Sequence, residues 1–367
     1  MIKRLIVLLL IASFTAMTPA FSVNTQKATA ATTQVTKEKK GTLIIKKVNA
    51  PSLKNNIIGE LLTQNIAVYL PPNYSTSGKK YPVLYFLPGY GDDYDTYGSM
   101  FKMLMDKLLA SGKANEMIVI CINGKNRFHG SFYVNSPVIG NWQDFIVKDV
   151  IPYVDGNFRT IKSAKGRGIA GHSMGGFGVL NLVMNCPGIF DSAYSMSPGI
   201  FAPGGLKDGP FDFSYLQDTG LRKLSKEEYV KRVEQMGWNQ DVTFAYGSAF
   251  AYDVKAGIPF IQCPKGDIEK GWTHDKIWAR WENGFGNLVE KVNKSKKNLL
   301  KLKAFTIEYG NYEENTWIPA GCKYFTKLLK KAGIPHKLVS FDGGHQDMVI
   351  DRVEKAVIPF FSQNINK

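Results

Sequence analysis

Hydrophobic and polar positions along the chain follow two different periods, which predict strands separated by helices. Thr42–Val48 and Asn65–Leu70 alternate in the manner of antiparallel edge strands. Tyr81–Leu87 and Met117–Ile122 are near-continuous apolar runs, as expected of strands covered on both faces. Four more strands are predicted at Arg167–Gly171, Asp191–Ser197, Leu302–Glu308 and Lys337–Phe341.

Helical patterns fill most of the segments between these strands. Asn141 is expected to cap the second helix, because an Asn side chain can accept a hydrogen bond from the first helical turn. The alternation of strand and helix predicts an α/β fold with a mainly parallel central sheet and helices on both faces. The helices are predicted at 96–111, 142–155, 176–185, 317–332 and 349–361.

The pattern changes between about Pro198 and Lys297, where Gly, Pro, Trp and charged residues dominate. Only one helix is predicted there, at Ser225–Met236. We interpret residues 198–297 as an insertion above one edge of the sheet. Residues 41–367 then form one domain, which is long enough to bury a sizeable core.

The first residues have the pattern of an export signal. Lys3 and Arg4 precede the apolar run Leu5–Phe14, and Thr18-Pro-Ala20 offers small residues for cleavage. We expect residues 1–31 to be a signal peptide with its processed segment, 32–40 to be a disordered linker, and the mature protein to be secreted. No later apolar run has the length of a membrane helix, so no membrane span is expected.

Charge and cysteine content exclude some classes of function. The formal net charge is +15, but the lysines are scattered along the chain. This favours a weak attraction to anionic cell-wall polymers over nucleic acid binding, and the dense run Lys291–Lys303 is interpreted as a solvated face. The four cysteines are widely spaced with no C-x-x-C, which excludes a zinc ribbon or a thioredoxin-type motif.

The strongest chemical signal is Gly171-His-Ser173-Met-Gly175, a G-x-S-x-G sequence. A predicted strand precedes it and a predicted helix follows it, which is the context of a nucleophile elbow. Such a turn pushes the serine hydroxyl out of the sheet toward a base. Ser173 is therefore the candidate nucleophile.

An acyl-transfer serine also needs a base and a carboxylate that orients the base. His345 follows the last predicted strand, in Asp342-Gly-Gly-His-Gln-Asp, and so emerges at the same edge of the sheet as Ser173. The preceding strand and the loop after it offer the candidate acids Glu308, Glu313 and Glu314. Glu308 lies within the strand, whereas the other two lie just beyond it.

Two backbone N–H groups are expected to bind the oxyanion that forms when the serine attacks. One is the N–H of Met174, immediately after the nucleophile. The other should come from the loop after the first central strand, Leu87-Pro-Gly-Tyr-Gly-Asp-Asp, where the N–H of Tyr90 is the natural donor. This chemistry requires no metal and no organic cofactor.

The chain resembles the putative esterase family, the esterase-D-like branch of the α/β-hydrolases. The resemblance extends from about Asn65 to Phe361 and implies an α/β-hydrolase fold. It assigns the family's nucleophile to Ser173 and its base to His345, and matching from Gly310 assigns its acid to Glu313. The motifs that carry it are Leu84-Tyr-Phe-Leu-Pro-Gly-Tyr-Gly, Gly130-Ser-Phe-Tyr-Val-Asn-Ser, Asp149-Val-Ile-Pro-Tyr-Val-Asp, Gly168-Ile-Ala-Gly-His-Ser-Met-Gly-Gly and Gly343-Gly-His345.

The chain departs from the pattern of this family at two positions. A glutamate stands where the acid is usually aspartate, and Pro88 replaces the histidine common before the oxyanion glycine. The secreted members of this branch imply a serine ester hydrolase that acts on feruloyl or acetyl esters of plant cell-wall polysaccharide. Transfer of the acyl group to a sugar hydroxyl, or a catalytically inactive protein that binds cell wall, are the alternatives.

The aromatic residues that could wall an acyl or sugar pocket are harder to assign. Phe128 and Phe132 lie in a long loop between the second central strand and the next helix, and Trp272, Trp278 and Trp281 lie in the insertion. Phe128, Phe132 and Trp272 are predicted to contact substrate. Burial of the same side chains as core beneath long loops is the alternative.

Overall fold

The computed structural model describes residues 40–267 and 271–365 of the chain. The predicted export signal, residues 1–31, lies outside the described residues, as does the linker 32–40 except for Lys40. Among the described residues, no helix combines the length and the apolar character needed to cross a membrane.

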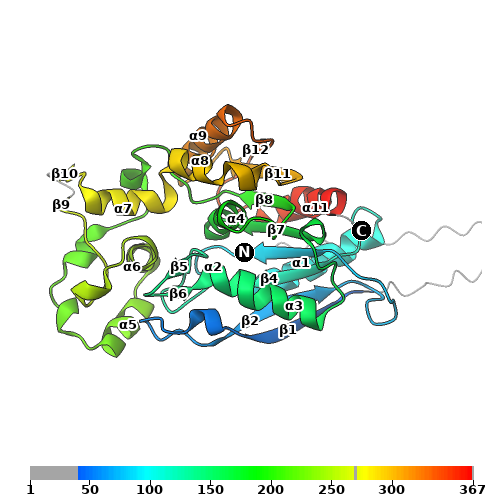
Figure 1. The fold of residues 1–367 in the computed structure, drawn as a ribbon, viewed down its shortest axis with the longest axis horizontal. Helices are drawn as coiled ribbons and strands as arrows, with labels where there is room; N and C mark the ends of the chain where they lie inside the picture. The colour runs from blue at the N-terminus through cyan, green and yellow to red at the C-terminus, as the bar shows by residue number, and fades with distance from the viewer. Residues whose placement is uncertain (1–39, 268–270, 366–367) are drawn as a thin grey trace, which may run out of the picture. The chain divides into compact units, whose positions relative to one another are not determined.

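A mixed sheet of eight strands forms the centre of the described fold (Figure 1). The strand order is β1-β2-β4-β3-β7-β8-β11-β12. β1 and β2 are antiparallel, β2 and β4 are antiparallel, and every later neighbouring pair is parallel. The strands are β1 Thr42–Asn49, β2 Thr63–Leu70, β3 Val83–Leu87, β4 Ile118–Ile122, β7 Arg167–His172, β8 Ser192–Met196, β11 Ala304–Gly310 and β12 Lys337–Phe341. The predicted mainly parallel sheet is confirmed.

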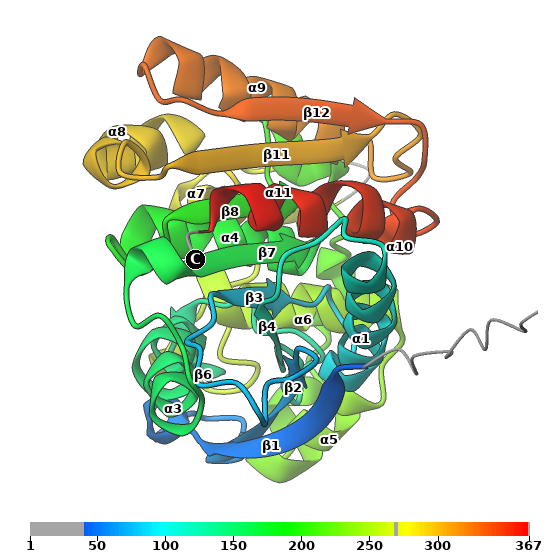
Figure 2. The same cartoon turned by 90° about the vertical axis from the view of Figure 1, so that its right-hand side faces the viewer.

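Helices cover both faces of this sheet. In Figure 2 the strands are stacked from β12 at the top to β1 at the bottom, and α11 lies in front of β8. Residues of α1 and α11 pack on one face of the sheet, and residues of α4, α8 and α9 pack on the other. The helices are α1 Tyr94–Ala110, α2 Trp142–Asp144, α3 Ile151–Asn157, α4 Met174–Asn185, α5 Lys226–Glu234, α6 Trp238–Phe250, α7 Lys276–Phe285, α8 Leu288–Leu299, α9 Trp317–Lys331, α10 Val349–Arg352 and α11 Ile358–Asn364. The π-helical stretches Phe145–Val150 and Val353–Val357 join α2 to α3 and α10 to α11.

The remaining regular elements are short. Two ribbons pair β5 Asn135–Ser136 with β6 Gly140–Asn141, and β9 Gly266–Asp267 with β10 Gly271–Trp272. Turns of 3-10 helix lie at Pro51–Leu53, Ala164–Gly166, Gly205–Asp208, Phe213–Gln217, Leu221–Lys223 and Val254–Ala256.

The residues of strand β3 pack into two hydrophobic cores, one on each face of the sheet. The side chains of β3 alternate, so Leu84 and Phe86 pack with α1 and α11 on one face, whereas Tyr85 and Leu87 enter the core of the other face. All five residues of β3 are completely buried. This accounts for the unbroken apolar run in its sequence.

The helix predicted after Asn141 forms, but the predicted cap is wrong. The Asn141 side chain makes no capping hydrogen bond, because its backbone is engaged in the β5–β6 ribbon. The side chain of Asn135, across that ribbon, instead accepts a hydrogen bond from Asp144 N–H at 3.1 Å. The capping group comes from a residue brought close by the ribbon rather than from the preceding residue.

Residues 198–297 contain more helix than the single predicted stretch. Three further helices form there: α6, α7 and most of α8. Helix α6 is buried along most of its length and therefore lacks a one-sided apolar stripe. Helix α8 packs on α4 and α9, so it belongs to the layer that covers the sheet, and the expected insertion boundary at 297 falls inside it.

Candidate active site

The parallel register brings three predicted residues to one edge of the sheet. Ser173 directly follows β7, Glu313 lies three residues after the end of β11, and His345 lies four residues after the end of β12. Because the carboxyl ends of parallel strands meet at one edge, residues far apart in sequence become neighbours there.

Ser173 occupies a sharp turn between β7 and α4. Its φ is +57° and its ψ is −115°, a backbone conformation that L-residues adopt only under constraint. Three backbone contacts hold the turn: Ser173 N–H donates to Met196 O at 2.9 Å, and Ser173 O accepts from Phe177 N–H at 3.0 Å and from Gly199 N–H at 3.3 Å. A methyl group at Gly175 would overlap Leu87 O, so only glycine allows the helix to approach β3 this closely.

A continuous chain of hydrogen bonds links the three side chains. Ser173 Oγ lies 2.8 Å from His345 Nε2, and His345 Nδ1 lies 2.8 Å from Glu313 Oε2. The Glu313 side chain is completely buried and that of His345 is nearly so. This arrangement lets the imidazole accept the serine proton while the carboxylate orients it and stabilises its charge.

The structure distinguishes the three candidate acids. Glu308 is buried in the sheet, where it forms an ion pair with Arg352 at 2.6 Å and accepts a hydrogen bond from Tyr194 at 2.5 Å. Glu314 accepts from the backbone N–H of His345 at 3.0 Å, and backbone N–H donors lower the pKa of its carboxyl. Only Glu313 reaches the imidazole, so Glu314 supports the histidine loop while Glu313 orients the ring.

His172 is a site residue that the sequence reasoning did not single out. Its Nε2 lies 2.9 Å from the carbonyl oxygen of His345, so its ring N–H supports the histidine loop from below. Burial, together with the nearby His345, lowers the pKa of His172 to about 3. The ring is therefore neutral near pH 7. Nothing in the sequence singles out His172, because the position between the first glycine and the serine of G-x-S-x-G accepts many side chains.

The two predicted oxyanion donors have free N–H groups. In the loop after β3, Gly89 N–H donates to Asp92 at 3.1 Å and Gly91 N–H donates to His129 O at 2.9 Å. The N–H of Tyr90 between them has no acceptor within the described parts of the chain. Met174 N–H lies in the first turn of α4, where helical acceptors are lacking. Both donors are thus available to a ligand.

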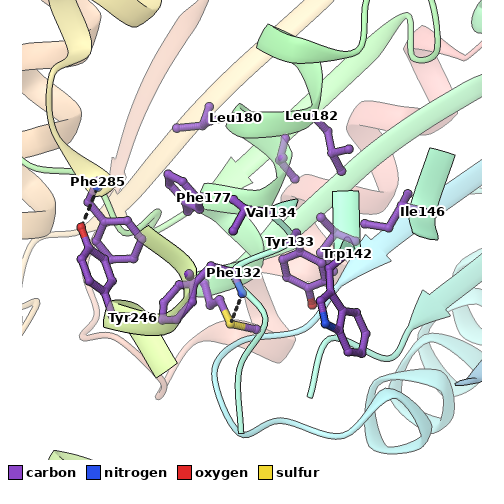
Figure 3. Packing of buried hydrophobic residues seen from close by; sticks show 14 of the residues in the cluster. Phe132, Tyr133, Val134, Trp142, Ile146, Phe177, Leu180, Leu182, Tyr246 and Phe285 are labelled. Carbon is purple, nitrogen blue, oxygen red and sulfur yellow. Dashed lines mark hydrogen bonds between the residues drawn. The ribbon is translucent and has the colours of Figure 1, made fainter. Parts of the chain in front are cut away.

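A cavity of about 540 Å³ opens over Ser173 and His345. Its walls are mostly apolar and aromatic, and they include Phe132, one of the residues predicted to contact substrate. Figure 3 shows Phe132 near Phe285 and Tyr246, within the aromatic cluster beneath this cavity. The other wall residues are Tyr90, Met174, Gly199, Pro210, Trp238, Val242, Phe285, Trp317 and Ile318, and the polar ones are Glu314, Asn315, Gln346 and Asp347.

Two residues predicted to contact substrate, Phe128 and Trp272, do not line this cavity. Phe128 is completely buried and packs edge-on against Tyr229, away from the cavity. Trp272 packs against Phe213 and Trp278 in the insertion and does not line the cavity either. The aromatic wall instead includes Trp238 and Trp317, neither of which the sequence assigned to the pocket.

No group of three or more His, Cys, Asp or Glu side chains in residues 40–267 and 271–365 could hold a metal ion. That the chemistry needs neither metal nor organic cofactor stays a prediction from the chemistry of the serine, histidine and glutamate.

The parallel sheet, the sharp turn bearing Ser173 and the histidine after the last strand define an α/β-hydrolase fold. The family model described as "Putative esterase" matches residues 63–348, which is most of the chain. The protein therefore belongs to the putative esterase family, and the predicted resemblance is confirmed.

Known proteins agree with this assignment. An esterase of Mycobacterium tuberculosis is 29% identical over 288 residues, 76% of this chain and 52% of that protein. An endo-1,4-beta-xylanase/feruloyl esterase of Xylanibacter ruminicola is 30% identical over 156 residues, 41% of this chain and 21% of that protein. The chain thus spans about half the length, or less, of these relatives.

Solved structures share the fold. A ferulic acid esterase superposes with a TM-score of 0.58 at 21% identity, covering 88% of this chain and 98% of that one. A fluorophosphonate-binding serine hydrolase of Staphylococcus aureus superposes with a TM-score of 0.55 at 18% identity, covering 89% and 100%. At these identities the likeness concerns the fold alone.

Proposed function

We propose that the protein is a serine carboxylic-ester hydrolase that works through an acyl-enzyme. The observation that carries the proposal is the hydrogen-bonded chain from Ser173 Oγ through the His345 ring to Glu313, with 2.8 Å at each link. The cavity above it and the free N–H groups of Tyr90 and Met174 supply the other requirements of acyl transfer.

Each group has a defined task in the proposed reaction. Ser173 Oγ attacks the ester carbonyl while His345 Nε2 takes its proton, and the N–H groups of Tyr90 and Met174 bind the oxyanion. His345 then returns the proton to the leaving alcohol, which leaves an acyl group on Ser173. A water molecule, deprotonated by His345, releases the acid and restores the serine.

We further propose that the natural substrates are feruloyl or acetyl esters of plant cell-wall polysaccharide, met outside the cell. The aromatic wall, with Trp317 and Phe285 stacked at 6.0 Å, suits a flat aromatic acyl group. The Xylanibacter relative, named an endo-1,4-beta-xylanase/feruloyl esterase, supports the same substrate class. The export pattern in residues 1–31 supports secretion.

The Ser173→Ala variant tests the chemistry. Removal of the nucleophile should lower kcat for p-nitrophenyl acyl esters by about 10⁴-fold or more, with the fold intact. Release of ferulate and acetate from feruloylated and acetylated xylans tests the substrate class in the same experiment. Near-wild-type hydrolysis by the alanine variant would refute the mechanism. Activity on p-nitrophenyl esters without activity on either xylan would refute only the substrate.

A further inference from the structure

The side chain of Tyr90 ends in a buried polar cluster outside the cavity. Tyr90 Oη lies 2.8 Å from Phe128 O and 2.9 Å from Asp241 Oδ1. The second carboxyl oxygen of Asp241 lies 2.6 Å from His129 Nδ1. The backbone of His129 accepts the hydrogen bond from Gly91 N–H. The cluster therefore holds the oxyanion loop at two adjacent positions, through the Tyr90 phenol and through the Gly91 amide.

Asp241 belongs to α6, in the segment between β8 and β11, and is almost completely buried. The same helix contributes Trp238 and Val242 to the cavity wall. The ring of Trp238 packs edge-on against the ring of Tyr90, with centroids 6.5 Å apart. One helix of the insertion thus contacts both the cavity and the loop that carries a predicted oxyanion donor.

The number of protons in the cluster predicts which substitution of Asp241 is tolerated. Tyr90 has one hydroxyl proton, but Phe128 O and an ionised Asp241 would both be acceptors. A protonated carboxyl at Asp241 would donate to Tyr90 Oη and accept from His129, which satisfies every partner, and burial raises the pKa of this carboxyl. An asparagine at 241 could also accept from His129 and donate to Tyr90 Oη.

We propose that Asp241, acting through the Tyr90 phenol and His129, is a positioning residue for ester hydrolysis. It fixes the backbone N–H of Tyr90 where the oxyanion forms. The segment 198–297 would then supply part of the hydrolytic machinery in addition to a wall of the cavity. This inference rests on the proposed function, because the Tyr90 N–H has this role only if Ser173 attacks an ester.

Steady-state kinetics of Asp241→Ala, Asp241→Asn and Tyr90→Phe with p-nitrophenyl acetate test the proposal. The alanine and phenylalanine variants should lose about tenfold or more in kcat, because small displacements of a transition-state contact are costly. KM should change by less than about twofold, since the small acetyl group makes few contacts. Asp241→Asn should retain most of the wild-type kcat, because it keeps both hydrogen bonds. Tyr90→Phe separates the hydrogen bond from packing, because it keeps the ring and removes only the hydroxyl.

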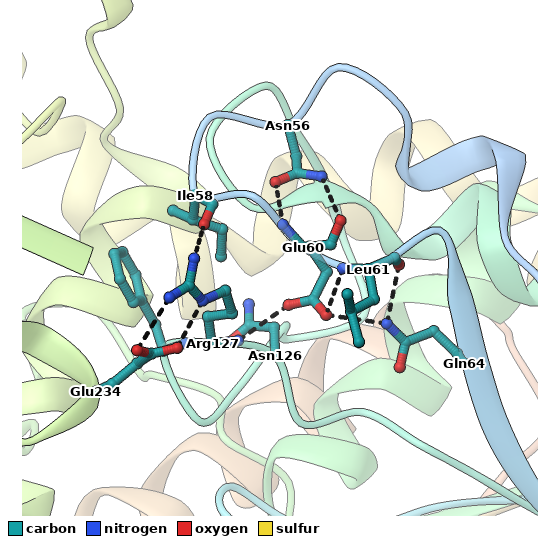
Figure 4. A network of polar contacts seen from close by, with 9 residues as sticks. Asn56, Ile58, Glu60, Leu61, Gln64, Asn126, Arg127 and Glu234 are labelled. Atoms are coloured by element: carbon teal, nitrogen blue, oxygen red, sulfur yellow. Dashed lines mark hydrogen bonds and ion pairs between the residues drawn. The ribbon is translucent and has the colours of Figure 1, made fainter. Parts of the chain in front are cut away.

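Glu234→Ala is the matched control. Glu234, on insertion helix α5, forms an ion pair with Arg127 at 2.5 and 3.0 Å, and Arg127 lies two residues before His129. Figure 4 shows this pair, with the Arg127 guanidinium also donating to Ile58 O. The control therefore breaks another polar link between the same loop and the insertion without touching Tyr90. It should lower the thermal midpoint and leave kcat unchanged.

Several results would overturn the positioning role. They are an unchanged kcat in Asp241→Ala, equal losses of kcat in Asp241→Ala and Glu234→Ala, or no rescue by Asp241→Asn. If Asp241→Ala fails to fold, Tyr90→Phe decides, because it removes one hydroxyl and keeps the ring. Hydrolysis that survives Ser173→Ala would instead refute the proposed function. An inactive Ser173→Ala beside a fully active Tyr90→Phe would refute only the positioning role.

Discussion

The turn at Ser173 and the segment 198–297 meet at the same cavity but are stabilised in different ways. The turn depends on backbone contacts so close that Gly175 tolerates no side chain. The segment depends on packing among large rings, such as Phe213 against Trp281 and Tyr246 against Phe285. Few side chains fit where two backbones approach this closely, whereas many combinations of side chains of similar total volume can fill a packed aromatic cluster.

We expect the two regions to have different roles, with the strand ends carrying the ester chemistry and the segment 198–297 deciding which ester is preferred. Ser173, Glu313 and His345 lie just beyond the ends of parallel strands, and the hydrogen bonds that link their side chains involve no side chain of the segment 198–297. That segment supplies Trp238, Val242 and Phe285 to the cavity wall. Changes at the strand ends should therefore abolish turnover, and changes in the wall should alter which ester is preferred. The hydrogen bond between Asp241 and the Tyr90 phenol, for which we propose a positioning role, links the two regions.

The largest effect short of removing the nucleophile should come from Glu313→Gln. An amide cannot stabilise the charged imidazole, and kcat should fall by about 10³- to 10⁴-fold. Glu314→Gln is the control, because Glu314 bonds only to the backbone N–H of His345 and to no side chain of the three proposed catalytic residues. It should cost less than about tenfold. Similar losses of kcat in the two variants would show that the structure misassigns the acid.

Gly175→Ala should have the next largest effect, on the free energy of unfolding instead of on kcat. Its methyl group would overlap Leu87 O, so the free energy of unfolding should fall by about 3 kcal/mol or more. A methyl group at Gly156, in α3, would meet no atom within 4 Å beyond its chain neighbours and its own helix backbone. Gly156→Ala should be neutral or stabilise by up to about 1 kcal/mol. Urea unfolding of both variants checks the contrast, and equal effects would contradict the steric account of the turn.

Wall residues should affect substrate binding by smaller amounts. Trp317→Leu removes an aromatic surface from the cavity and should raise KM for methyl ferulate by about tenfold, or about 1.4 kcal/mol. Its kcat for p-nitrophenyl acetate should stay within about threefold of wild type. Trp272→Leu, outside the cavity, should change neither value. A rise in KM from Trp272→Leu, with none from Trp317→Leu, would mean that the substrate binds elsewhere.

The buried His172 should make stability depend on pH. Its pKa is lowered from about 6.5 in the unfolded chain to about 3 in the folded one, so the unfolded state binds the extra proton between these values. The contribution of neutral His172 is complete above pH 6.5 and is lost progressively below it, by at most about 1.4 kcal/mol per pH unit. His172→Asn should flatten the fall in unfolding free energy between pH 7 and pH 5. Parallel curves for the two proteins would contradict this account.

The residues that strands and sharp turns position were predictable from the sequence. Ser173 and His345 follow apolar strands, and the sheet topology alone brings them to one edge. Physical reasoning alone could not choose the acid among Glu308, Glu313 and Glu314. A shift of one or two positions in the loop decides whether a carboxylate reaches the His345 ring. Matching from Gly310 to the family pattern selected the residue that the structure places 2.8 Å from His345.

The cavity wall was not predictable, for reasons of packing. Helix α6 is buried on most sides, so its sequence has no helical stripe to reveal it. Phe128 and Trp272 look like pocket residues by type, but only the tertiary fold decides that one enters the core and the other packs within the insertion. His172 and Asp241 carry no sequence signal, since their partners come from distant loops.

The most direct test of the central claim is covalent labelling of the native protein with a fluorophosphonate, read by peptide mass spectrometry. A fluorophosphonate reacts with a serine whose hydroxyl is activated by a neighbouring base. The account predicts one adduct, on the peptide that contains Ser173, and no adduct in Ser173→Ala. An adduct on another residue, or equal labelling of the alanine variant, would contradict it.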